Sequence, residues 1–564
     1  MKTIILSPSR LLFLLTFIYF SGENQALSQN FSFAKSMGGF DTDFGKAITT
    51  DHSGNVYTTG YFQGTVDFDP DSGVFELTSA GFYDIFVSKL DATGKLVWAV
   101  RMGGKGFEQG NGIVLDDLGN VYITGDFTDT ADFDPSPLPV NLASAGANDI
   151  FISKLDPDGN FVWAKRIGGP GNDYASAIVI DHLGNIYTTG EFWQTVDFNP
   201  DGGVFEITTS AGRGEAFVLK LDVTGSFVWA KSMGGDDDTE GLAIAVDSLQ
   251  NVYTTGSFEG TVDFGQFTFT CAGGTYPDIF ISKLNVSGEF VWAKAFGDTN
   301  DDVGKGIAVD DSGHVYVTGE FYGIIDFGSM PGLGRLDAGE SRSNFILKLD
   351  QFGGFVWANR FGTGSGDGIA LDGSHNVYTI GDFSGTADFD PGIGTFELTS
   401  QGSTFISKLD AGGSFVWAFN YEGPGSTIGM GIAVDGSENV YTTGAFSDSI
   451  DFNPDPVGKF SLAPVGSFDI FVSKFQPFPL DIQEIPSQRL FSIYPNPSNG
   501  QIHIEADASL IRSAYSLFDH SGRVVLSGTL LTENTIVNLE NFPGGLYTLI
   551  IHQKNRQAFK VMKY

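Results

Sequence analysis

Short runs of alternating apolar and polar residues, bounded by Gly, Asn or Asp, fill most of the chain. Four kinds of run follow one another in a fixed order, and examples are 306–310 (GIAVD), 55–60 (NVYTTG), 149–155 (DIFISKL) and 161–165 (FVWAK). β-Branched and aromatic residues dominate these runs, and no long stretch has the period of an amphipathic helix. The pattern therefore predicts an all-β protein built from units of four short strands.

The four-run unit recurs seven times. Its second run begins, in order, at Asn55, Asn120, Asn185, Asn251, His314, Asn376 and Asn439, so a unit is about 64 residues long. Four strands repeated seven times is the composition of a seven-bladed β-propeller, in which the blades surround a central channel. We therefore predict a seven-bladed propeller over residues 29–478.

One copy of the fourth run is separated from its unit by almost the whole chain. The last unit stops at Phe475, after its third run. Residues 31–37 (FSFAKSM), in contrast, match the fourth run at 161–167 (FVWAKRI), with Phe33 in the place of Trp163. Strand 31–37 is therefore predicted to complete the last blade and to close the ring, which also removes exposed strand edges.

The connections between runs sort to the two faces of the predicted disc, because antiparallel strands alternate in direction. Short turns with Asp and Gly, such as 51–54 and 91–94, share one face, which we call the plain face. Longer acidic connections, including an insertion such as 66–78 between runs two and three, share the other, which we call the long-loop face. Binding residues usually lie on such loops, so a ligand is expected on the long-loop face.

Charge and cysteine content narrow the possible partners. The 564-residue chain has a formal net charge of −37, which disfavours nucleic acid and anionic lipid as partners. The only cysteine, Cys271, excludes an intramolecular disulfide and is expected to be a small buried apolar residue.

The N-terminus has the pattern of a secretory signal peptide over residues 1–28. Lys2 and Arg10 form a basic region before an apolar run at 11–20, which is too short to span a bilayer. Small residues at 26 and 28 suit signal peptidase, so Gln29 is the expected mature start. No later segment is apolar enough for a transmembrane helix. The pattern predicts an exported protein.

The repeat ends near residue 478, and a different module follows. Pro479 and Pro486 lie in a predicted linker at 479–488. Residues 489–564 then alternate apolar runs such as 490–494 and 545–551 with turn clusters such as 495–500. Several short strands over about 75 residues predict a small Ig-like β-sandwich.

Both parts resemble known families. The Asn-Val-Tyr-x-Thr-Gly and Asp-x-Phe-x-x-Lys-Leu-Asp runs are similar to the bacterial seven-bladed β-propeller (SBBP) repeat over about residues 31–478, a resemblance that implies no defined activity. The C-terminal module resembles the type A sorting domain of the type IX secretion system. The matching segments are 494–497 (YPNP), 518–523 (FDHSGR), 542–547 (FPGGLY) and 560–563 (KVMK).

The second resemblance implies a Gram-negative source, recognition of residues 489–564 by the type IX machinery, and passage across the outer membrane. Removal of the domain would then release the protein or anchor it on surface polysaccharide. The alternative is a ligand-binding sandwich that happens to be C-terminal, because a fold alone does not define a function.

Candidate chemistry along the chain is sparse. No His-Glu-x-x-His, Cys-x-x-Cys or Gly-x-Ser-x-Gly motif occurs, and residues 39–46 only approach a phosphate loop. Asp-Phe-Asp-Pro segments in the insertions, as at Asp67, Asp69 and Asp71, could ligate calcium, but the ligand set is incomplete and an Asp-Pro turn with a buried Phe is favoured. No metal, cofactor or catalytic residue is therefore assigned.

Two residue types remain as possible binding groups. Four histidines, His52, His182, His314 and His375, fall in or beside plain-face turns of separate units and are interpreted as tolerated turn residues. The repeated Trp of the fourth run is interpreted as packing between blades. Trp193 breaks that pattern near an insertion and is the candidate ligand-binding aromatic.

These observations favour an exported, non-enzymatic surface or secreted scaffold that binds a glycan or protein on its long acidic loops. The alternative is an extracellular polysaccharide lyase or hydrolase that uses the propeller channel. Such an enzyme should break the repeat with convergent His, Arg or Tyr on the long-loop face, and no such break is evident along the chain.

Overall fold

The computed structural model describes residues 29–328, 332–455, 458–477, 491–519, 524–552 and 557–563. The predicted signal peptide at 1–28 and linker at 479–488 lie outside these residues. Within the described ranges every element is a β-strand except one 3-10 turn, η1 (Ala508–Leu510), and no helix is long and apolar enough to cross a membrane. The fold is all-β, as the alternating pattern predicted.

The described residues between 29 and 477 form seven four-stranded antiparallel blades. Blade 1 contains β2 (Phe44–Thr50), β3 (Val56–Phe62), β6 (Asp84–Leu90) and β7 (Leu96–Gly104). Blade 2 contains β8 (Glu108–Leu115), β9 (Val121–Asp132), β10 (Asn141–Leu155) and β11 (Phe161–Ile167). Blade 3 contains β12 (Tyr174–Ile180), β13 (Ile186–Phe192), β16 (Glu215–Leu221) and β17 (Phe227–Gly235). Blade 4 contains β18 (Thr239–Val246), β19 (Val252–Phe258), β22 (Asp278–Leu284) and β23 (Phe290–Phe296).

The remaining blades follow the same order. Blade 5 contains β24 (Asp302–Val309), β25 (Val315–Asp326), β26 (Arg335–Leu349) and β27 (Phe355–Phe361). Blade 6 contains β28 (Thr363–Leu371), β29 (Val377–Asp388), β30 (Glu397–Leu409) and β31 (Phe415–Asn420). Blade 7 contains β32 (Thr427–Val434), β33 (Val440–Phe446), β36 (Asp469–Pro477) and, from the other end of the propeller, β1 (Gln29–Gly39).

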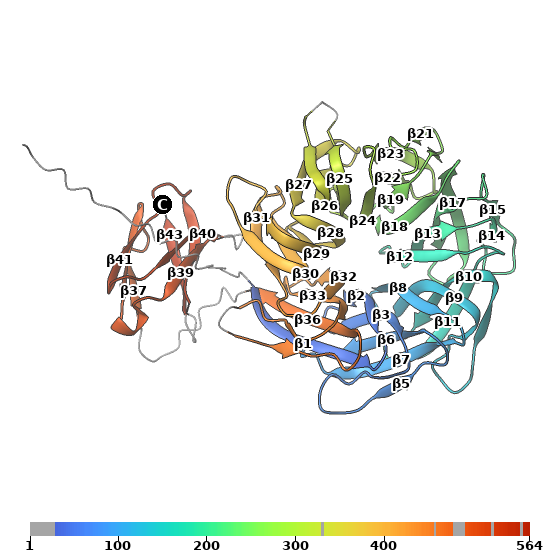
Figure 1. Ribbon diagram of the computed structural model, residues 1–564, viewed down its shortest axis with the longest axis horizontal. Helices are drawn as coiled ribbons and strands as arrows, with labels where there is room; N and C mark the ends of the chain where they lie inside the picture. The colour runs from blue at the N-terminus through green and yellow to red at the C-terminus, as the bar shows by residue number, and fades with distance from the viewer. Residues whose placement is uncertain are drawn as a thin grey trace, which may run out of the picture.

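The first strand of each blade is the innermost. Figure 1 shows β2, β8, β12, β18, β24, β28 and β32 around the centre of the disc, and each lies against the first strands of both neighbouring blades. Glycines in the first strands also allow a close approach to the second strand of the preceding blade. A Cβ on Gly110 of β8 would lie 2.3 Å from Oγ1 of Thr59 in blade 1, and one on Gly45 of β2 would lie 2.3 Å from Oγ1 of Thr443 in blade 7.

The ring is closed by the N-terminal strand. β1 runs antiparallel to β36, from Gln29 opposite Pro477 to Met37 opposite Ile470. Phe33, Ala34 and Met37 are buried in this interface. The first described strand therefore supplies the fourth strand of the last blade, and the pairing extends beyond the copy recognised at 31–37.

The insertions form small hairpins, and in blades 1, 2, 3, 4 and 7 the hairpin pairs with the chain of the preceding blade. Separate hairpins are formed by β4 (Thr65–Asp67) with β5 (Glu76–Thr78), β14 (Thr195–Asp197) with β15 (Glu206–Thr208), β20 (Thr261–Phe264) with β21 (Phe267–Thr270), and β34 (Ile450–Asp451) with β35 (Ser461–Leu462). In blades 2, 5 and 6 the hairpin is an extension of strands two and three. The end of β1 pairs with β4 of the next blade, and the end of β17 pairs with β20.

The plain face is held by a repeated side-chain arrangement. In blade 1, Asp51 accepts hydrogen bonds from the backbone of Ser53 and Asn55 and from the Tyr57 hydroxyl, and the ammonium of Lys89 lies 4.9 Å from the Tyr57 ring centroid. The indole N–H of Trp98 donates to the carbonyl of Pro157 in the next blade (3.2 Å). The repeated Trp therefore packs between blades. His52 and His182 are exposed on separate turns.

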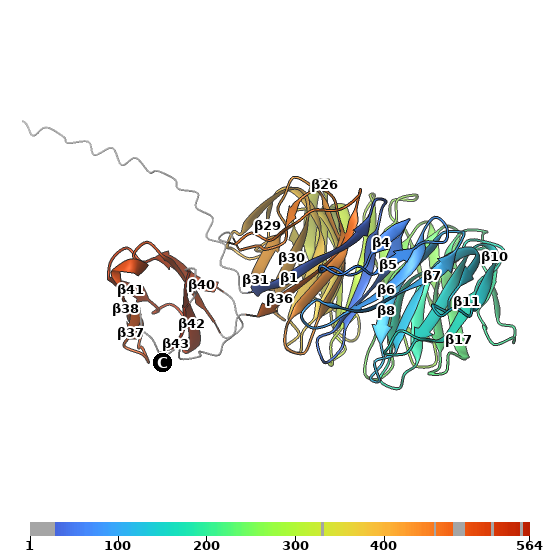
Figure 2. The same ribbon diagram turned by 90° about the horizontal axis from the view of Figure 1, so that it is seen from below.

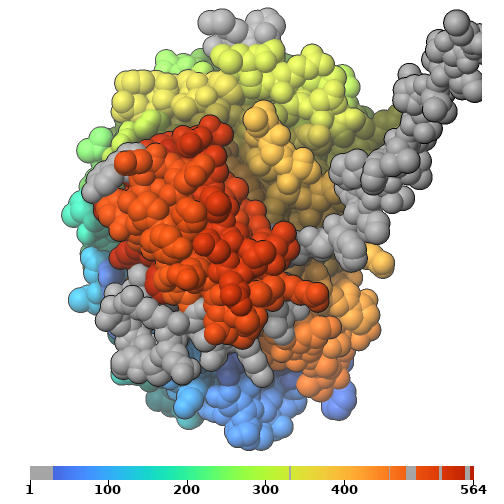
Figure 3. Space-filling view, turned by 90° about the vertical axis from the view of Figure 1, so that its left-hand side faces the viewer, coloured from blue at the N-terminus to red at the C-terminus, as the bar shows by residue number. Residues whose placement is uncertain are grey.

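The C-terminal module has two sheets. One contains β37 (Phe491–Tyr494), β38 (Gln501–Ala506) and β41 (Asn534–Asn538), and the other contains β40 (Val524–Thr529), β39 (Ala514–Phe518), β42 (Gly545–Ile551) and β43 (Gln557–Lys563). Ile504, Leu517 and Leu549 are among the buried residues between them. Figure 2 shows the strands of both sheets, and Figure 3 shows the module, in red, as a compact body.

Candidate ligand-binding site at the long-loop end of the channel

Each first strand carries a β-bulge close to its long-loop end. In blade 1 the register with β3 shifts between Gly45 and Ala47, and the same shift recurs in the other six blades. A β-bulge leaves one residue unpaired in the hydrogen-bond ladder between the strands and changes the direction of its side chain. The bulged residues are Lys46, Asn111, Ser176, Leu242, Lys305, Asp367 and Met430. A symmetric scaffold thus presents a ring of seven side chains of six different types around the axis.

Six aromatic rings from blades 7, 1 and 2 form a continuous run beside this ring of bulges. We call them the aromatic arc: Phe468, Phe44, Tyr61, Tyr83, Phe107 and Phe82. Neighbouring ring centroids along the run are 5.6, 5.4, 4.8, 5.7 and 4.8 Å apart. All six residues lie at the long-loop ends of strands or in the adjoining loops.

The arc combines a supported base with an exposed end. Backbone amides of Asp43 and Glu108 donate to the carbonyls of Phe468 and Tyr83, so bonds between neighbouring blades hold its loops. Phe107 and Phe82 are 44% and 56% exposed and stack with an interplanar angle of 5°. Exposed, clustered aromatic side chains on a folded protein are typical of binding surfaces.

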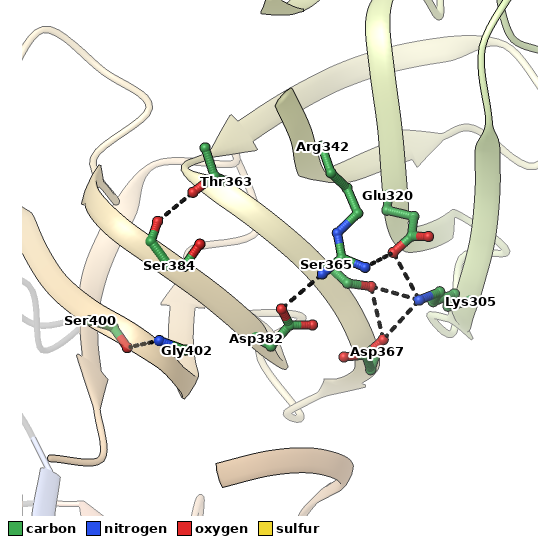
Figure 4. A network of polar contacts seen from close by, with 10 residues as sticks. All are labelled: Lys305, Glu320, Arg342, Thr363, Ser365, Asp367, Asp382, Ser384, Ser400 and Gly402. Carbon is green, nitrogen blue, oxygen red and sulfur yellow. Dashed lines mark hydrogen bonds and ion pairs between the residues drawn. The ribbon is translucent and has the colours of Figure 1, made fainter. Parts of the chain in front are cut away.

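The opposite side of the channel mouth carries a charged cluster from blades 5 and 6 (Figure 4), which consists of Lys305, Glu320, Arg342, Asp367 and Asp382. The Lys305 ammonium lies 2.9 Å from Glu320 and 3.2 Å from Asp367. The Arg342 guanidinium lies 3.1 Å from Glu320 and 2.9 Å from Asp382. Although burial opposes its charge, the Asp367 and Glu320 carboxylates raise the pKa of Lys305. Both cations of the cluster are therefore already paired.

Lys46, on the other side of the mouth, is different. Its Nζ has no hydrogen bond or ion pair within the described part of the chain, and it lies 5.8 Å from the Tyr61 ring centroid. Burial lowers the pKa of Lys46, and the charge of Asp126 offsets this only in part. Asp126 itself accepts a 3.0 Å hydrogen bond from Asn111.

Carboxyl groups with raised pKa values lie between the arc and the charged cluster. Burial raises the pKa of Asp126 to about 6. Burial, together with the charges of Glu240 and Asp238, raises the pKa of Glu191 to about 8. Burial and the charges of these two acids, Asp126 and Glu191, raise the pKa of Tyr174. Perturbed carboxyl groups in a channel are compatible with binding or with acid–base chemistry.

A further set of buried carboxylates holds the long loops. Asp173 accepts backbone hydrogen bonds from Gly169 (2.8 Å) and Trp193 (3.0 Å), and Asp302 accepts them from Asp298 and Tyr322. Burial raises the pKa of Asp173 to about 7 and that of Asp302 to about 8. These groups shape the long-loop face and link its stability to pH.

We expect the protein to lose stability as the pH rises from about 5.5 to about 8.5. Asp302 and Asp173 have higher pKa values in the folded state than in the unfolded chain, where the pKa of an Asp is about 4. Unfolding therefore releases protons between those pH values, and a higher pH favours the unfolded chain. Thermal melts at both pH values measure the change. Asp302→Asn should reduce the difference.

The matched control for this prediction is Asp51→Asn on the plain face. Hydrogen bonds from Asn55, Ser53 and Tyr57 outweigh burial and lower the pKa of Asp51, so this group is ionised throughout the interval and its replacement should leave the pH difference unchanged. A melting temperature that rises from about pH 5.5 to about pH 8.5 would contradict the expectation.

Trp193 lies on the long-loop face, as predicted, but apart from the aromatic arc. It is half-buried, and its indole N–H donates to the Glu191 carboxylate (3.0 Å) while its backbone N–H donates to Asp173. The side chain is thus partly engaged in holding its own loop. Its role as a ligand contact stays a prediction.

The Asp-Phe-Asp-Pro segments use their carboxylates within their own turns. Asp67 accepts hydrogen bonds from the backbone of Asp69 (3.0 Å) and Phe75 (2.8 Å), and Asp71 pairs with Lys35 of the preceding blade. Phe68 is fully buried between Phe62 and Phe86. No group of three or more His, Cys, Asp or Glu side chains within the described ranges is arranged to hold a metal ion. The geometry agrees with a structural turn.

The arc and the charged cluster are breaks in the repeat that the sequence interpretation missed. Tyr61 occupies the position that Asp126, Glu191, Ser257, Glu320, Asp382 and Ala445 hold in the other blades. Arg342, within β26, likewise occupies the position that Tyr83 holds just before the third strand of blade 1. The expectation that no convergent Tyr or Arg breaks the repeat was wrong. These breaks in the repeat can be found from the sequence by comparing the residues at equivalent positions of the seven units.

Comparison with known proteins identifies both parts of this exported propeller. Residues 162–191 and 291–320 match the model of the β-propeller repeat (SBBP), and residues 492–563 match the secretion system C-terminal sorting domain. The chain therefore carries SBBP β-propeller repeats followed by a type IX secretion sorting domain, which marks it for export across the outer membrane.

Two curated relatives are similar over part of their length. The uncharacterized WD repeat-containing protein L264 of Acanthamoeba polyphaga mimivirus is 25% identical over 556 residues, covering 82% of this chain and 40% of that protein. The regulatory protein FlaEY of Caulobacter vibrioides is 24% identical over 246 residues, covering 41% of this chain and 24% of that protein. The chain spans less than half the length of either relative.

Solved structures show distant similarity. Sqt1 from Chaetomium thermophilum covers 79% of this chain and 99% of its own, with 9% identity and a TM-score of 0.36. PorZ of Porphyromonas gingivalis, described as an essential bacterial surface component of the type IX secretion system, covers 94% of this chain and 100% of its own, with 10% identity and a TM-score of 0.17.

Proposed function

We propose that the mature protein is a non-enzymatic cell-surface or secreted binding module, and that its ligand surface is the long-loop end of the channel. The observation that carries the proposal is the aromatic arc. Six rings gather at one place, and among them Tyr61 occupies a position where the other six blades have acidic or small residues. Two of the six rings, Phe82 and Phe107, are largely exposed. The sorting domain brings this surface to the cell exterior.

The chemistry of the arc supports binding. Large rigid aromatic side chains contribute much contact area and lose little conformational entropy on association, which is why they dominate binding hot spots. Hydrogen bonds from the adjoining loops hold the base of the arc before any ligand arrives. A preformed surface of this kind suits an adhesive or capturing role.

The first test replaces the exposed rings. Phe82→Ser combined with Phe107→Ser should weaken ligand binding by about tenfold or more, because each buried aromatic anchor contributes about 1–2 kcal/mol or more. Binding of the mature protein to an array of neutral and acidic polysaccharides, mucin, collagen and fibronectin, followed by titration of each hit, measures the effect.

The matched control lies on the opposite face of the same disc. Leu118 and Leu183 are 80% and 58% exposed in plain-face turns, so Leu118→Ser with Leu183→Ser removes similar exposed apolar area. This variant should bind as the unchanged protein does. Equal losses in both variants, or no binding to any polymer on the array, would count against a site on the long-loop face.

The same array tests the enzymatic alternative. Asp126, Glu191 and Tyr174 are the set in the channel best suited to acid–base chemistry, because both carboxyl groups have raised pKa values and both act on the Tyr174 hydroxyl. Reproducible cleavage of an array polysaccharide that is lost in Glu191→Gln would replace the binding-only proposal with a polysaccharide lyase or hydrolase.

A further inference from the structure

We infer that the aromatic arc and Lys46 together form a carbohydrate site for a sugar chain that bears an isolated carboxylate, that is, a glycan with a neutral backbone and a uronic acid substituent. The inference rests on the proposed function and narrows its ligand. It depends on three features: the run of rings, the free hydroxyls within it, and one unpaired cation beside it.

The run of rings provides a stacking surface. The apolar C–H faces of pyranose rings pack on aromatic rings in the way that other flat apolar groups do, while the sugar hydroxyls point outward. Phe107 and Phe82 form the exposed end of the run, and Tyr61, which stacks on Phe44 at 19°, lies further along it beside Lys46. A chain of several sugars laid along the arc would therefore lead from solvent towards the channel.

The two tyrosines supply polar contacts at the centre of the run. The hydroxyls of Tyr61 and Tyr83 have no hydrogen-bond partner in the part of the chain that the structure describes, although both rings are half-buried. Burial, with the neighbouring Tyr83 and Asp43, raises the pKa of Tyr61 to about 12, so its hydroxyl stays protonated and can donate or accept. Unpaired hydroxyls on an aromatic surface suit a polyhydroxylated ligand better than a purely apolar one.

Lys46 determines the expected charge of the ligand. The other cations at the channel mouth, Lys305 and Arg342, are neutralised by Glu320, Asp367 and Asp382. The Lys46 ammonium is partly desolvated and lacks such a partner within the described residues. A carboxylate on the ligand would complete the missing ion pair next to Tyr61, and charge-assisted hydrogen bonds are about twice as strong as neutral ones.

The surrounding charges favour one carboxylate over many. Asp41 is exposed in the loop that precedes Phe44, Asp126 lies within electrostatic range of Lys46, and the chain has a net charge of −37. A polyuronate would place further carboxylates against this negative field. A neutral chain with a single acidic substituent gains the contact with Lys46 without that repulsion.

The experiment compares two ligands on the mature protein, residues 29–564. Calorimetric titration uses a xylo-oligosaccharide that carries one glucuronic acid and the unsubstituted xylo-oligosaccharide of the same length. The acidic sugar should bind about tenfold more tightly, the range expected for one charge-assisted contact. Methyl esterification of the glucuronic acid should remove the preference, and this arm needs no change to the protein.

Variants then assign the preference to Lys46. Lys46→Met should bind both sugars equally, whereas Lys46→Arg should keep the preference. Lys105→Met is the matched control, because Lys105 is an exposed lysine close to Phe107 and its loss should leave the preference intact. Tyr61→Ala should weaken both sugars.

The outcomes separate this inference from the proposed function. Equal affinity of the unchanged protein for the acidic and neutral sugars, or a preference that survives in Lys46→Met, would overturn the carboxylate contact. If neither sugar binds while a protein on the array binds through Phe82 and Phe107, the proposed binding module stands and the carbohydrate site is wrong.

Discussion

Without residues 29–39 the propeller should fail to fold into a soluble, closed ring. Blade 7 would keep only β32, β33 and β36, and the edge of β36 from Ile470 to Pro477 would lose its hydrogen-bonded partner. Burying Phe33 and Met37 is worth about 1.5–3 kcal/mol each, which is a large fraction of the 5–15 kcal/mol by which domains are usually stable. Soluble yield, thermal melting and dye binding to exposed apolar surface measure the effect.

Two further variants separate ring closure from simple loss of residues. Phe33→Ser should destabilise the protein strongly because Phe33 is buried, whereas Phe40→Ser should have little effect because Phe40 is 84% exposed just after the strand. Moving residues 29–39 behind residue 477, through a short Asp-Ala-Thr-Gly turn, should restore the fold, since β1 would then follow β36 as β7 follows β6. A soluble ring with an unchanged melting temperature after removal of 29–39 would show that closure is dispensable.

Deletion of residues 491–564 should abolish delivery to the cell exterior and leave a folded propeller in the periplasm. The sorting domain is a separate two-sheet module with its own core, so its loss removes the export signal and leaves the blades intact. Cell fractionation with a melting curve of the trapped protein measures both outcomes. Normal appearance outside the cell would contradict recognition of these residues by the type IX machinery.

A single residue offers a milder test of the same module. Asn496 lies in the YPNP segment, and its side chain donates to the carbonyl of Lys560 (2.6 Å) and accepts from the amide of Met562 (2.8 Å). It therefore ties the start of the module to its last strand, and Asn496→Ala should lower export partially. Gln501→Ala is a suitable control, because Gln501 is exposed.

Much of this architecture follows from local sequence. Repeats at about 64 residues predict equal blades, and the Asp turns predict which strands are joined by tight hairpins. The match between 31–37 and 161–167 predicts the pairing that β1 makes with β36. Strand alternation then assigns each loop to a face with no knowledge of distances, because antiparallel neighbours must reverse direction.

The role of some glycines depends on contacts between blades, which the repeat pattern does not predict. Paired glycines end β1 and β17. A Cβ on Gly39 would lie 2.4 Å from the Thr65 carbonyl oxygen, and one on Gly235 would lie 1.6 Å from that of Thr261. They are needed because the insertion hairpin of the next blade pairs there. The requirement becomes visible only when neighbouring blades are placed side by side.

The candidate site shows the same division. From the sequence alone we could predict which loops share the long-loop face, because strand direction and loop length are local properties of the repeat. Which residues meet on that face depends on the tertiary structure. Phe44 and Phe468 are far apart along the chain, and their ring centroids come within 5.6 Å because the ring closes. Lys305 forms ion pairs with Glu320 and Asp367, whereas Tyr61 and Asn111 occupy the corresponding positions around Lys46. Contacts between blades depend on the closed ring, whereas the order of strands and turns can be predicted from the sequence of each unit.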